Sequence, residues 1–186
     1  MPRAESTFSL PRGIAAPDFV LPDTVSGALL DLHVWRAQRV TVLMFICNHC
    51  PYVLHILEAL LQRAREYQAR GVAFAAISSN DVSRYPQDAP DAMQALAATR
   101  GFGFPYLYDE SQSVARAYQA ACTPDFYVLA ADGRLAWSGR FDESTPGNGK
   151  PVTGADLAAA LDTVLAGLEC DPQARPSIGC SIKWKA

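Results

Sequence analysis

The residues of this chain with the greatest capacity for chemistry form one short segment, Cys47-Asn48-His49-Cys50. A cysteine attacks disulfides and binds metals as its thiolate, and a free cysteine has a pKa of about 8.5. Two cysteines at this spacing can close a disulfide across the start of a helix, because their sulfur atoms then lie within bonding range. The segment therefore predicts either a redox-active dithiol or half of a zinc site.

The residues that flank this segment favour the redox function. Residues 39–46 are nearly all apolar or β-branched, which is typical of a strand buried on both faces. Pro51 is favoured in the first turn of a helix, because its missing N–H has no helical partner there. We expect Cys47 to lie partly exposed at the helix start, where about half a positive charge lowers its pKa. Cys50 is expected to be more buried, one turn in, and to resolve a mixed disulfide formed at Cys47.

The two residues between the cysteines support the same chemistry. Asn48 can donate a side-chain hydrogen bond, and His49 can carry positive charge near the sulfur atoms. A positive charge stabilises the thiolate and hence the reduced form, which makes the disulfide a stronger oxidant. We therefore expect a midpoint potential above the thioredoxin value of about −270 mV.

A zinc site is the alternative explanation of this spacing. A structural zinc ion is usually held by two such pairs of Cys or His ligands. The sequence has no second pair, and the other candidate ligands are mostly scattered along the chain: His33, His49, His55, Cys122, Cys170 and Cys180. We therefore expect no metal and no cofactor.

Strand and helix patterns alternate along the rest of the chain. Two short extended stretches around Gly27 predict a hairpin before the reactive segment. A helix is expected from Pro51 to about residue 69, closed by Gly71. The further elements are expected as strands at 72–77, 106–108, 125–130 and 134–138 and as helices at 91–99, 113–118 and 153–168. This order predicts an α/β sheet with helices on both faces.

The composition is that of one globular domain covering residues 1–186, with 49% apolar and 19% charged residues. We expect an irregular lead-in at 1–17 and an irregular tail at 170–186. The net charge of −3 gives no reason to expect nucleic acid as a partner. No apolar run approaches the roughly 20 residues of a membrane span, and none follows the first basic residue. We therefore expect a cytoplasmic protein that does not enter a membrane.

Four segments also carry a family resemblance: Ala16-Pro17-Asp18-Phe19, residues 45–53, Cys122-Thr123-Pro124-Asp125-Phe126 and residues 176–184. They resemble a bacterial branch of peroxiredoxin-like and thioredoxin-like proteins in the alkyl hydroperoxide reductase–thiol-specific antioxidant (redoxin) superfamily. The resemblance runs from about residue 13 to the end of the chain. It implies a thioredoxin-like fold with a mixed central sheet, an N-terminal hairpin extension and an insertion between the first helix and the next strand.

The resemblance also implies roles for residues outside the cysteine pair. Pro124 is expected to be a cis proline, a form found in only about 5–6% of X–Pro bonds. The loop that carries Thr123 and Pro124 is expected to pack against the sulfur atoms and to offer backbone groups to a substrate. The expected partners are protein or small-molecule thiols and disulfides, together with an electron-donor reductase.

Two other functions fit the same fold. Peroxiredoxins use a Thr-x-x-Cys centre with an earlier proline and an arginine that holds the thiolate. Cys50 followed by Pro51 matches the peroxidatic position, but Cys47 replaces the threonine and Leu43 replaces the earlier proline. The loop at 122–124 has no arginine. A redox-inert binding module is the second alternative, which the intact cysteine pair disfavours because only the chemistry requires both sulfur atoms.

The other cysteines allow several roles. Cys122 precedes the proline loop and is either a third redox thiol or, as we favour, a small core residue. Cys180 is either inert or a redox thiol that pairs with Cys170 or reaches Cys47 as a resolving partner. Cys170 is expected to be inert. We expect His33 to be structural.

Overall fold

The computed structural model describes residues 3–7, 10–36, 38–171 and 175–186. Those parts of the expected lead-in and tail that fall at 1–2, 8–9 and 172–174 lie outside the described residues. No helix in the described part of the chain combines the length and the apolar character needed to cross a membrane.

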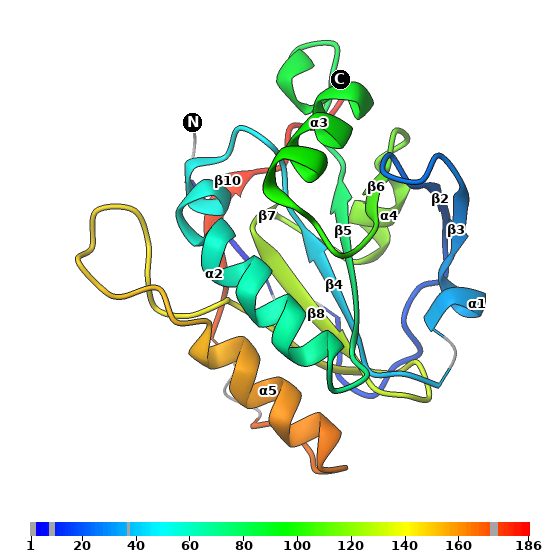
Figure 1. Cartoon of the computed structure of the whole chain (residues 1–186), viewed down its shortest axis with the longest axis vertical. Coiled ribbons are helices and arrows are strands. Elements are labelled where there is room, and N and C mark those ends of the chain that lie inside the picture. The colour runs from blue at the N-terminus through cyan, green and yellow to red at the C-terminus, as the bar shows by residue number, and fades with distance from the viewer. Residues whose placement is uncertain (1–2, 8–9, 37, 172–174) are drawn as a thin grey trace.

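A five-stranded mixed sheet forms the centre of the molecule, with the strand order β6-β5-β4-β8-β9 (Figure 1). The parallel strands are β4 (Thr41–Phe45), β5 (Ala73–Ser78) and β6 (Tyr106–Tyr108). The antiparallel strands are β8 (Asp125–Leu129) and β9 (Leu135–Gly139). Every residue of β4 is buried, as expected for a central strand covered on both faces.

Helices cover both faces of this sheet, as the alternation of elements predicted. On one face lie α2 (Pro51–Gln68), α3 (Pro90–Arg100) and α5 (Ala155–Leu165), and the other is covered by α1 (Leu32–Arg36), α4 (Ser113–Ala117) and the hairpin of β2 (Val20–Pro22) and β3 (Leu29–Asp31). Figure 1 shows α2 and α5 in front of the sheet and α4 behind it. Val42 and Met44 of β4 belong to the first core, and Leu43 and Phe45 to the second, because successive strand residues face opposite sides.

The extra segment of the fold lies in a different place from the one the resemblance implied. Only residues 69–72 join α2 to β5, so the expected insertion between the first helix and the next strand is wrong. The additional segment instead follows β5 and contains the 3₁₀ helix η1 (Pro86–Asp88) and α3. This segment places η1 next to the cysteine segment. The backbone and the side chain of Asn48 both donate hydrogen bonds to residues of η1.

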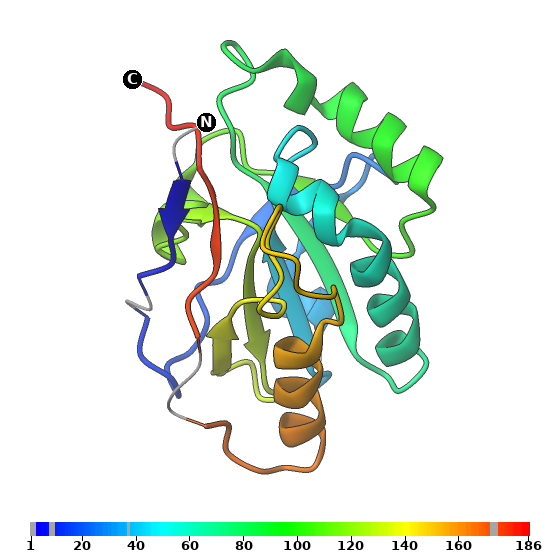
Figure 2. The ribbon, with the colours of Figure 1, turned by 90° about the vertical axis from the view of Figure 1, so that its left-hand side faces the viewer.

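The expectation of an irregular lead-in and tail is wrong for two segments. β1 (Arg3–Glu5), β10 (Ile178–Ser181) and β7 (Cys122–Thr123) form a separate antiparallel sheet in the order β1-β10-β7. Figure 2 shows β1 and β10 side by side. These strands have little periodicity of their own, because their pairing is supplied by residues more than 50 positions away in the chain.

Candidate active site

The reactive segment lies where the central strand β4 leads into helix α2. Cys50 is the N-cap residue of α2, and Pro51 occupies the first turn. The helix begins at Pro51 as predicted, since a proline in the first turn leaves no helical acceptor unsatisfied. The expectation that Cys47 lies at the helix start and Cys50 one turn in is wrong, because Cys50 itself precedes the first helical residue and Cys47 lies three residues earlier. The start of a helix also presents backbone amides that favour an anion.

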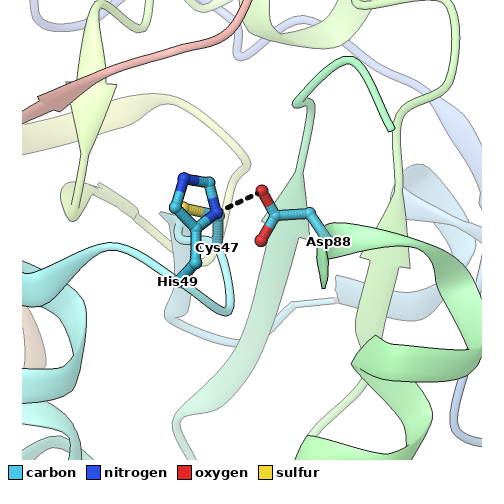
Figure 3. Close-up of side chains that lie close together, drawn as sticks. All are labelled: Cys47, His49 and Asp88. Atoms are coloured by element: carbon cyan, nitrogen blue, oxygen red, sulfur yellow. Dashed lines mark ion pairs between the residues drawn. The ribbon is translucent and has the colours of Figure 1, made fainter. Parts of the chain in front are cut away.

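Both cysteines are buried. The relative exposure is 2% for Cys47 and 0% for Cys50, so the expectation of a partly exposed Cys47 is wrong. The sulfur of Cys47 lies 3.5 Å from the Thr123 hydroxyl oxygen and is close to His49 and Asp88 (Figure 3). These groups come from three separate segments of the chain, and their packing around the sulfur accounts for its burial.

The order of the two thiol pKa values is the reverse of the expected one. A hydrogen bond from Cys47, opposed by burial, lowers the pKa of Cys50 to about 5. The same hydrogen bond, then burial and the charge of Asp88, raise the pKa of Cys47 well above its ordinary value. The expected low pKa of Cys47 is therefore wrong. The thiolate of the reduced pair resides on Cys50, and Cys47 keeps the proton.

The Thr123-Pro124 peptide bond is cis, as the resemblance implied. The preceding residue contacts both sulfur atoms: the Thr123 hydroxyl faces Cys47, and the Thr123 carbonyl oxygen lies 3.2 Å from the sulfur of Cys50. A protonated Cys50 donates its hydrogen to the Thr123 carbonyl oxygen, whereas a Cys50 thiolate accepts a hydrogen bond from the Cys47 thiol. The two contacts therefore correspond to two protonation states of the pair, with the proton on Cys50 or on Cys47. We favour the thiolate on Cys50, because Cys180 and the Val53 amide also lower its pKa.

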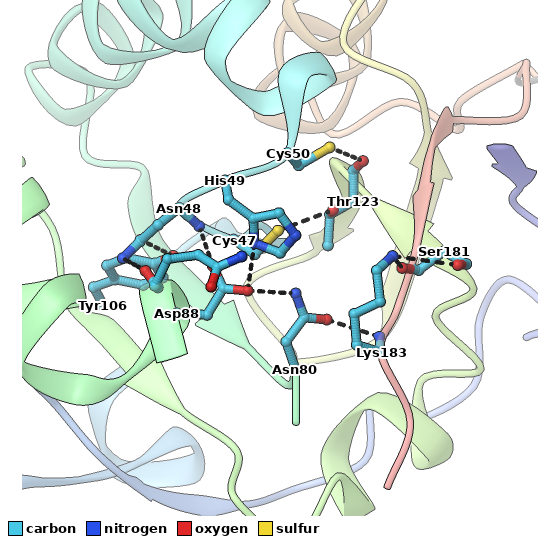
Figure 4. A network of polar contacts seen from close by, with 11 residues as sticks. Cys47, Asn48, His49, Cys50, Asn80, Asp88, Tyr106, Thr123, Ser181 and Lys183 are labelled. Carbon is cyan, nitrogen blue, oxygen red and sulfur yellow. Dashed lines mark hydrogen bonds and ion pairs between the residues drawn. The ribbon is translucent and has the colours of Figure 1, made fainter. Parts of the chain in front are cut away.

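Asp88 is the centre of a polar network beside the cysteines, and it has no solvent exposure (Figure 4). Its Oδ1 accepts a hydrogen bond of 2.9 Å from the Asn48 amide, and its Oδ2 accepts one of 2.8 Å from the Asn80 side chain. The Nδ1 atom of His49 lies 2.7 Å from Oδ2. The His49 ring also stacks on Tyr85, with 5.5 Å between ring centroids. Asp88 thus fixes the orientation of the imidazole next to Cys47.

The role of Asp88 could not be found in the sequence. The residue lies 38 positions beyond Cys50, in a polar stretch with no helical or strand periodicity. Pro86 and Pro90 on either side of it indicate a turn but no function. Asn48 donates the side-chain hydrogen bond that was expected, but to the Gln87 carbonyl, so it attaches the cysteine segment to η1.

Cys47, His49 and Asp88 each place one potential metal-ligating atom within 4.8 Å of the others. Both carboxylate oxygens of Asp88 already accept hydrogen bonds from protein amides. Many enzymes activate a cysteine nucleophile with a base that is oriented by an acidic residue. Cys47, His49 and Asp88 fit this arrangement better than they fit a metal site.

The two other histidines lie outside this network. His33 is exposed, with its Nδ1 atom 3.9 Å from the carboxylate of Asp18. The Nε2 atom of His55 lies 2.8 Å from the hydroxyl oxygen of Ser144 and holds the loop before α5.

All five cysteines are free thiols, and all are buried. Cys122 has its sulfur 3.7 Å from the Ser177 carbonyl oxygen, and burial raises its pKa, which agrees with a core role. Cys170 lies 3.7 Å from the Ala160 carbonyl oxygen, and burial raises its pKa as well. Cys180 differs from both, because it lies opposite Thr123, whose carbonyl oxygen contacts Cys50, and because burial and then its interaction with Cys50 raise its pKa to about 12. The structure thus brings Cys180 to Cys50, not to Cys170.

The tail also occupies the edge of the proline loop. Cys180 of β10 is the register partner of Thr123. The tail therefore pairs with the backbone of the loop that was expected to offer its backbone groups to a substrate. The Lys183 amide donates a hydrogen bond of 2.8 Å to Asn80, which in turn donates to Asp88 (Figure 4). The tail is therefore part of the site.

Solved structures provide two close matches. The crystal structure of an uncharacterized conserved protein from Geobacillus kaustophilus is 48% identical, with a TM-score of 0.96, over 100% of this chain and 97% of the other. That of a hypothetical protein from Sinorhizobium meliloti 1021 is also 48% identical, with a TM-score of 0.92, over 96% of this chain and 97% of the other.

A more distant match supports the fold alone. A secreted Mycobacterium tuberculosis disulfide oxidoreductase is 21% identical, with a TM-score of 0.60, over 77% of this chain and 94% of the other. No match is found among the curated proteins. Residues 13–138, more than half of the chain, match the AhpC/TSA family. This chain therefore belongs to the AhpC/TSA (redoxin) family of thioredoxin-fold proteins.

Proposed function

We propose that this protein is a thiol–disulfide oxidoreductase that cycles Cys47 and Cys50 between a dithiol and a disulfide. The observation that carries the proposal is the placement of both sulfur atoms against Thr123 at the start of α2. In this arrangement the interaction with Cys47 lowers the pKa of Cys50 to about 5. Since one proton is shared between the two sulfur atoms, one member of the pair is already a thiolate near neutral pH.

Cys47 attacks the disulfide of the partner. The partly buried imidazole of His49, held by Asp88, accepts the proton of the Cys47 thiol, and the resulting positive charge is stabilised by the carboxylate. The Cys47 sulfur then forms a bond to one sulfur of the partner, while the other leaves as a thiolate and takes up a proton. The product of this step is a mixed disulfide at Cys47.

Cys50 resolves the mixed disulfide. Its thiolate attacks the sulfur of Cys47, and the second partner sulfur leaves, so that the partner gains two electrons and the pair becomes a disulfide. The low pKa of Cys50 suits this role, because a resolving thiolate needs no base. Thr123 contacts both sulfur atoms and keeps them together during the exchange.

The proposed partners are protein or small-molecule disulfides, and an electron-donor reductase that restores the dithiol. We place the activity in the cytoplasm, away from membranes and nucleic acid. Five free cysteines suit a compartment in which thiols are kept reduced.

Reduction of insulin with dithiothreitol tests the proposal. Wild-type protein should accelerate the reaction, and Cys47→Ser and Cys50→Ser should each abolish the acceleration. Cys50→Ser should accumulate a mixed disulfide with the partner, whereas Cys47→Ser should not. Cys170→Ser is the matched control, because this buried thiol contacts a carbonyl next to α5 and should leave the rate unchanged. An inactive wild type with a fully reducible Cys47–Cys50 pair would instead indicate a binding module.

Peroxide reduction is the second candidate, because the thiolate lies on Cys50, the position that resembles the peroxidatic cysteine. In that reaction the Cys50 thiolate attacks one peroxide oxygen, the O–O bond breaks, and the other oxygen leaves as water or an alcohol, which gives a sulfenic acid at Cys50. The Cys47 thiol then condenses with the sulfenic acid to give the disulfide and a molecule of water. Peroxide consumption with dithiothreitol as the donor separates the candidates. Turnover of peroxide without acceleration of insulin reduction would favour the peroxidase.

A further inference from the structure

The C-terminal strand β10 is pressed against the proline loop at the reactive centre. In the antiparallel ladder with β7, Cys180 lies opposite Thr123, the residue whose carbonyl oxygen contacts Cys50. Directly opposed residues of such a ladder have Cα atoms about 4.5–5.5 Å apart. A side chain at Gly179 would overlap the Thr123 carbonyl oxygen and would lie 2.6 Å from its carbon. Only glycine allows β10 to approach this closely.

This approach delivers a third thiol to the cysteine pair. Cys180 is 3% exposed and lies in the same core cluster as Cys47 and Cys50. Its register partner Thr123 contacts the sulfur of Cys50, and Cys180 lies close enough to Cys50 for each thiol to shift the pKa of the other. Cys50 thus has two thiol neighbours, and a sulfur with two thiol neighbours can exchange one disulfide partner for the other.

We propose that Cys180 is a third redox thiol, which takes over the disulfide by attacking the sulfur of Cys50. The inference rests on the proposed function, because it begins with a disulfide between Cys47 and Cys50. The Cys180 sulfur forms a bond to Cys50 while the Cys47–Cys50 bond breaks. Cys180 loses its proton and Cys47 leaves as a thiolate that takes one up, so no outside oxidant or reductant is consumed.

The electrostatics of the cluster make this exchange conditional on oxidation. Burial, then the hydrogen bond and negative charge of Cys50, raise the pKa of Cys180 to about 12 in the reduced centre. The second and third causes disappear once Cys50 is part of a disulfide. Cys180 therefore becomes a better nucleophile at the stage when its target has formed, and Lys183 also favours its thiolate.

The result of the exchange is that Cys47 is free again. Cys47 is the thiol next to His49 and Asp88, whereas the oxidised pair would link Cys50 at the start of α2 to Cys180 of β10. The protein can then hold one disulfide internally and still offer a thiol to a second partner. The other cysteines are not placed for this role, since Cys122 and Cys170 direct their sulfur atoms to backbone carbonyls.

Peptide mapping of the oxidised protein tests the proposal. In a Cys170→Ser background, trypsin leaves Cys47 and Cys50 in peptide 40–63, Cys122 in peptide 117–134 and Cys180 in peptide 141–183, because prolines protect Lys150 and Arg175 from cleavage. After oxidation with diamide and alkylation of the remaining thiols, mass spectrometry should find peptide 40–63 linked to 141–183. Adding Cys47→Ser should retain the link, and adding Cys180→Ser should abolish it.

The outcomes separate this proposal from the proposed function. If wild-type protein reduces insulin and forms only the Cys47–Cys50 disulfide, and the Cys47→Ser background gives no link to peptide 141–183, the role of Cys180 is refuted and the oxidoreductase stands. If no disulfide involving Cys47 forms and insulin is not reduced, the proposed function fails. Cys122→Ser is the matched control and should retain the link. Cys180→Ala serves in place of Cys180→Ser if serine disturbs the fold.

Discussion

The Nδ1 atom of His49 lies 2.7 Å from the carboxylate of Asp88, which is fully buried next to Cys47. This pair lies beside the thiols, where water screens charges little. In the proposed mechanism the imidazole becomes positive when it accepts the Cys47 proton and then favours the thiolate, while the Cys50 hydrogen bond, burial and the charge of Asp88 raise the pKa of Cys47. The redox potential of the centre therefore depends on both residues.

Replacement of His49 should make the disulfide a weaker oxidant. His49→Ala removes the group that takes up the Cys47 proton and leaves the charge of Asp88 unopposed beside the sulfur atoms, which destabilises the thiolate. We expect the midpoint potential to fall by about 30 mV, which is about a tenfold change in the equilibrium constant of a two-electron couple. A titration against glutathione measures it. His33→Ala is the matched control, since its exposed ring lies next to Asp18 and Arg36. An unchanged potential in His49→Ala would contradict this electrostatic role.

Asp88→Asn should affect both stability and rate. The Asp88 carboxylate accepts hydrogen bonds from Asn48 and Asn80 and lies next to the His49 ring. An asparagine has only one acceptor oxygen, so its NH₂ group must point at one of these neighbours. We expect the free energy of unfolding to fall by about 1–3 kcal/mol, the usual cost of unsatisfied buried polar groups. Insulin reduction should slow by more than the loss of folded protein explains, because His49 is no longer oriented. Asp91→Asn, at an exposed carboxylate, should change neither quantity by a comparable amount.

The reduced protein should contain a thiolate well below neutral pH. Ultraviolet absorbance of the thiolate, followed as a function of pH, should show a step near pH 5 that belongs to Cys50. Cys50→Ser should remove this step. Cys47→Ser should move it to higher pH, because the largest cause of the low pKa is the hydrogen bond from Cys47. A step that survives in Cys50→Ser and disappears in Cys47→Ser would place the thiolate on Cys47.

The cysteine segment could be predicted because its signals are local. A buried strand, the spacing of two cysteines and a proline at the helix start all fall within residues 39–51, so sequence patterns place the cysteine segment directly before a helix that begins at Pro51. They do not show that Cys50 rather than Cys47 lies at the helix start. The same holds for the helices and strands of the central sheet, whose apolar periodicity follows the faces that they bury.

The rest of the site depends on contacts between distant segments. Asp88 and Cys180 reach the cysteine pair from η1 and β10, and no pattern around either residue indicates this. The burial of Cys47 and the order of the two pKa values follow from these same contacts. Local reasoning from the helix dipole therefore placed the thiolate on the wrong cysteine.

Asp125 should make the stability depend on pH. Burial raises its pKa from 3.8 to about 7, and its Oδ1 atom has no hydrogen-bond partner. Between these values the folded protein holds a proton that the unfolded chain has lost, so the free energy of unfolding should fall as the pH rises from about 4 through about 7. Asp125→Asn should flatten this dependence in urea denaturation, while Asp132→Asn, at an exposed turn, should retain it. A wild-type stability that rises over this range, with no difference in Asp125→Asn, would contradict the assignment.

Gly179→Ala should separate β10 from the proline loop. The added methyl group would overlap the Thr123 carbonyl oxygen and lie 3.2 Å from the Pro124 nitrogen, and both are backbone atoms that have little room to move. We expect a loss of about 1–3 kcal/mol in the free energy of unfolding, as is typical of overpacking. Gly103→Ala is the matched control, because its methyl group would meet only the end of the Gln68 side chain, at 3.4 Å. Since Cys180 follows Gly179 in the same strand, the diamide-induced link between peptides 40–63 and 141–183 should also weaken in Gly179→Ala and persist in Gly103→Ala. A full-strength link in Gly179→Ala would show that close pairing of β10 with β7 is not what brings Cys180 to Cys50.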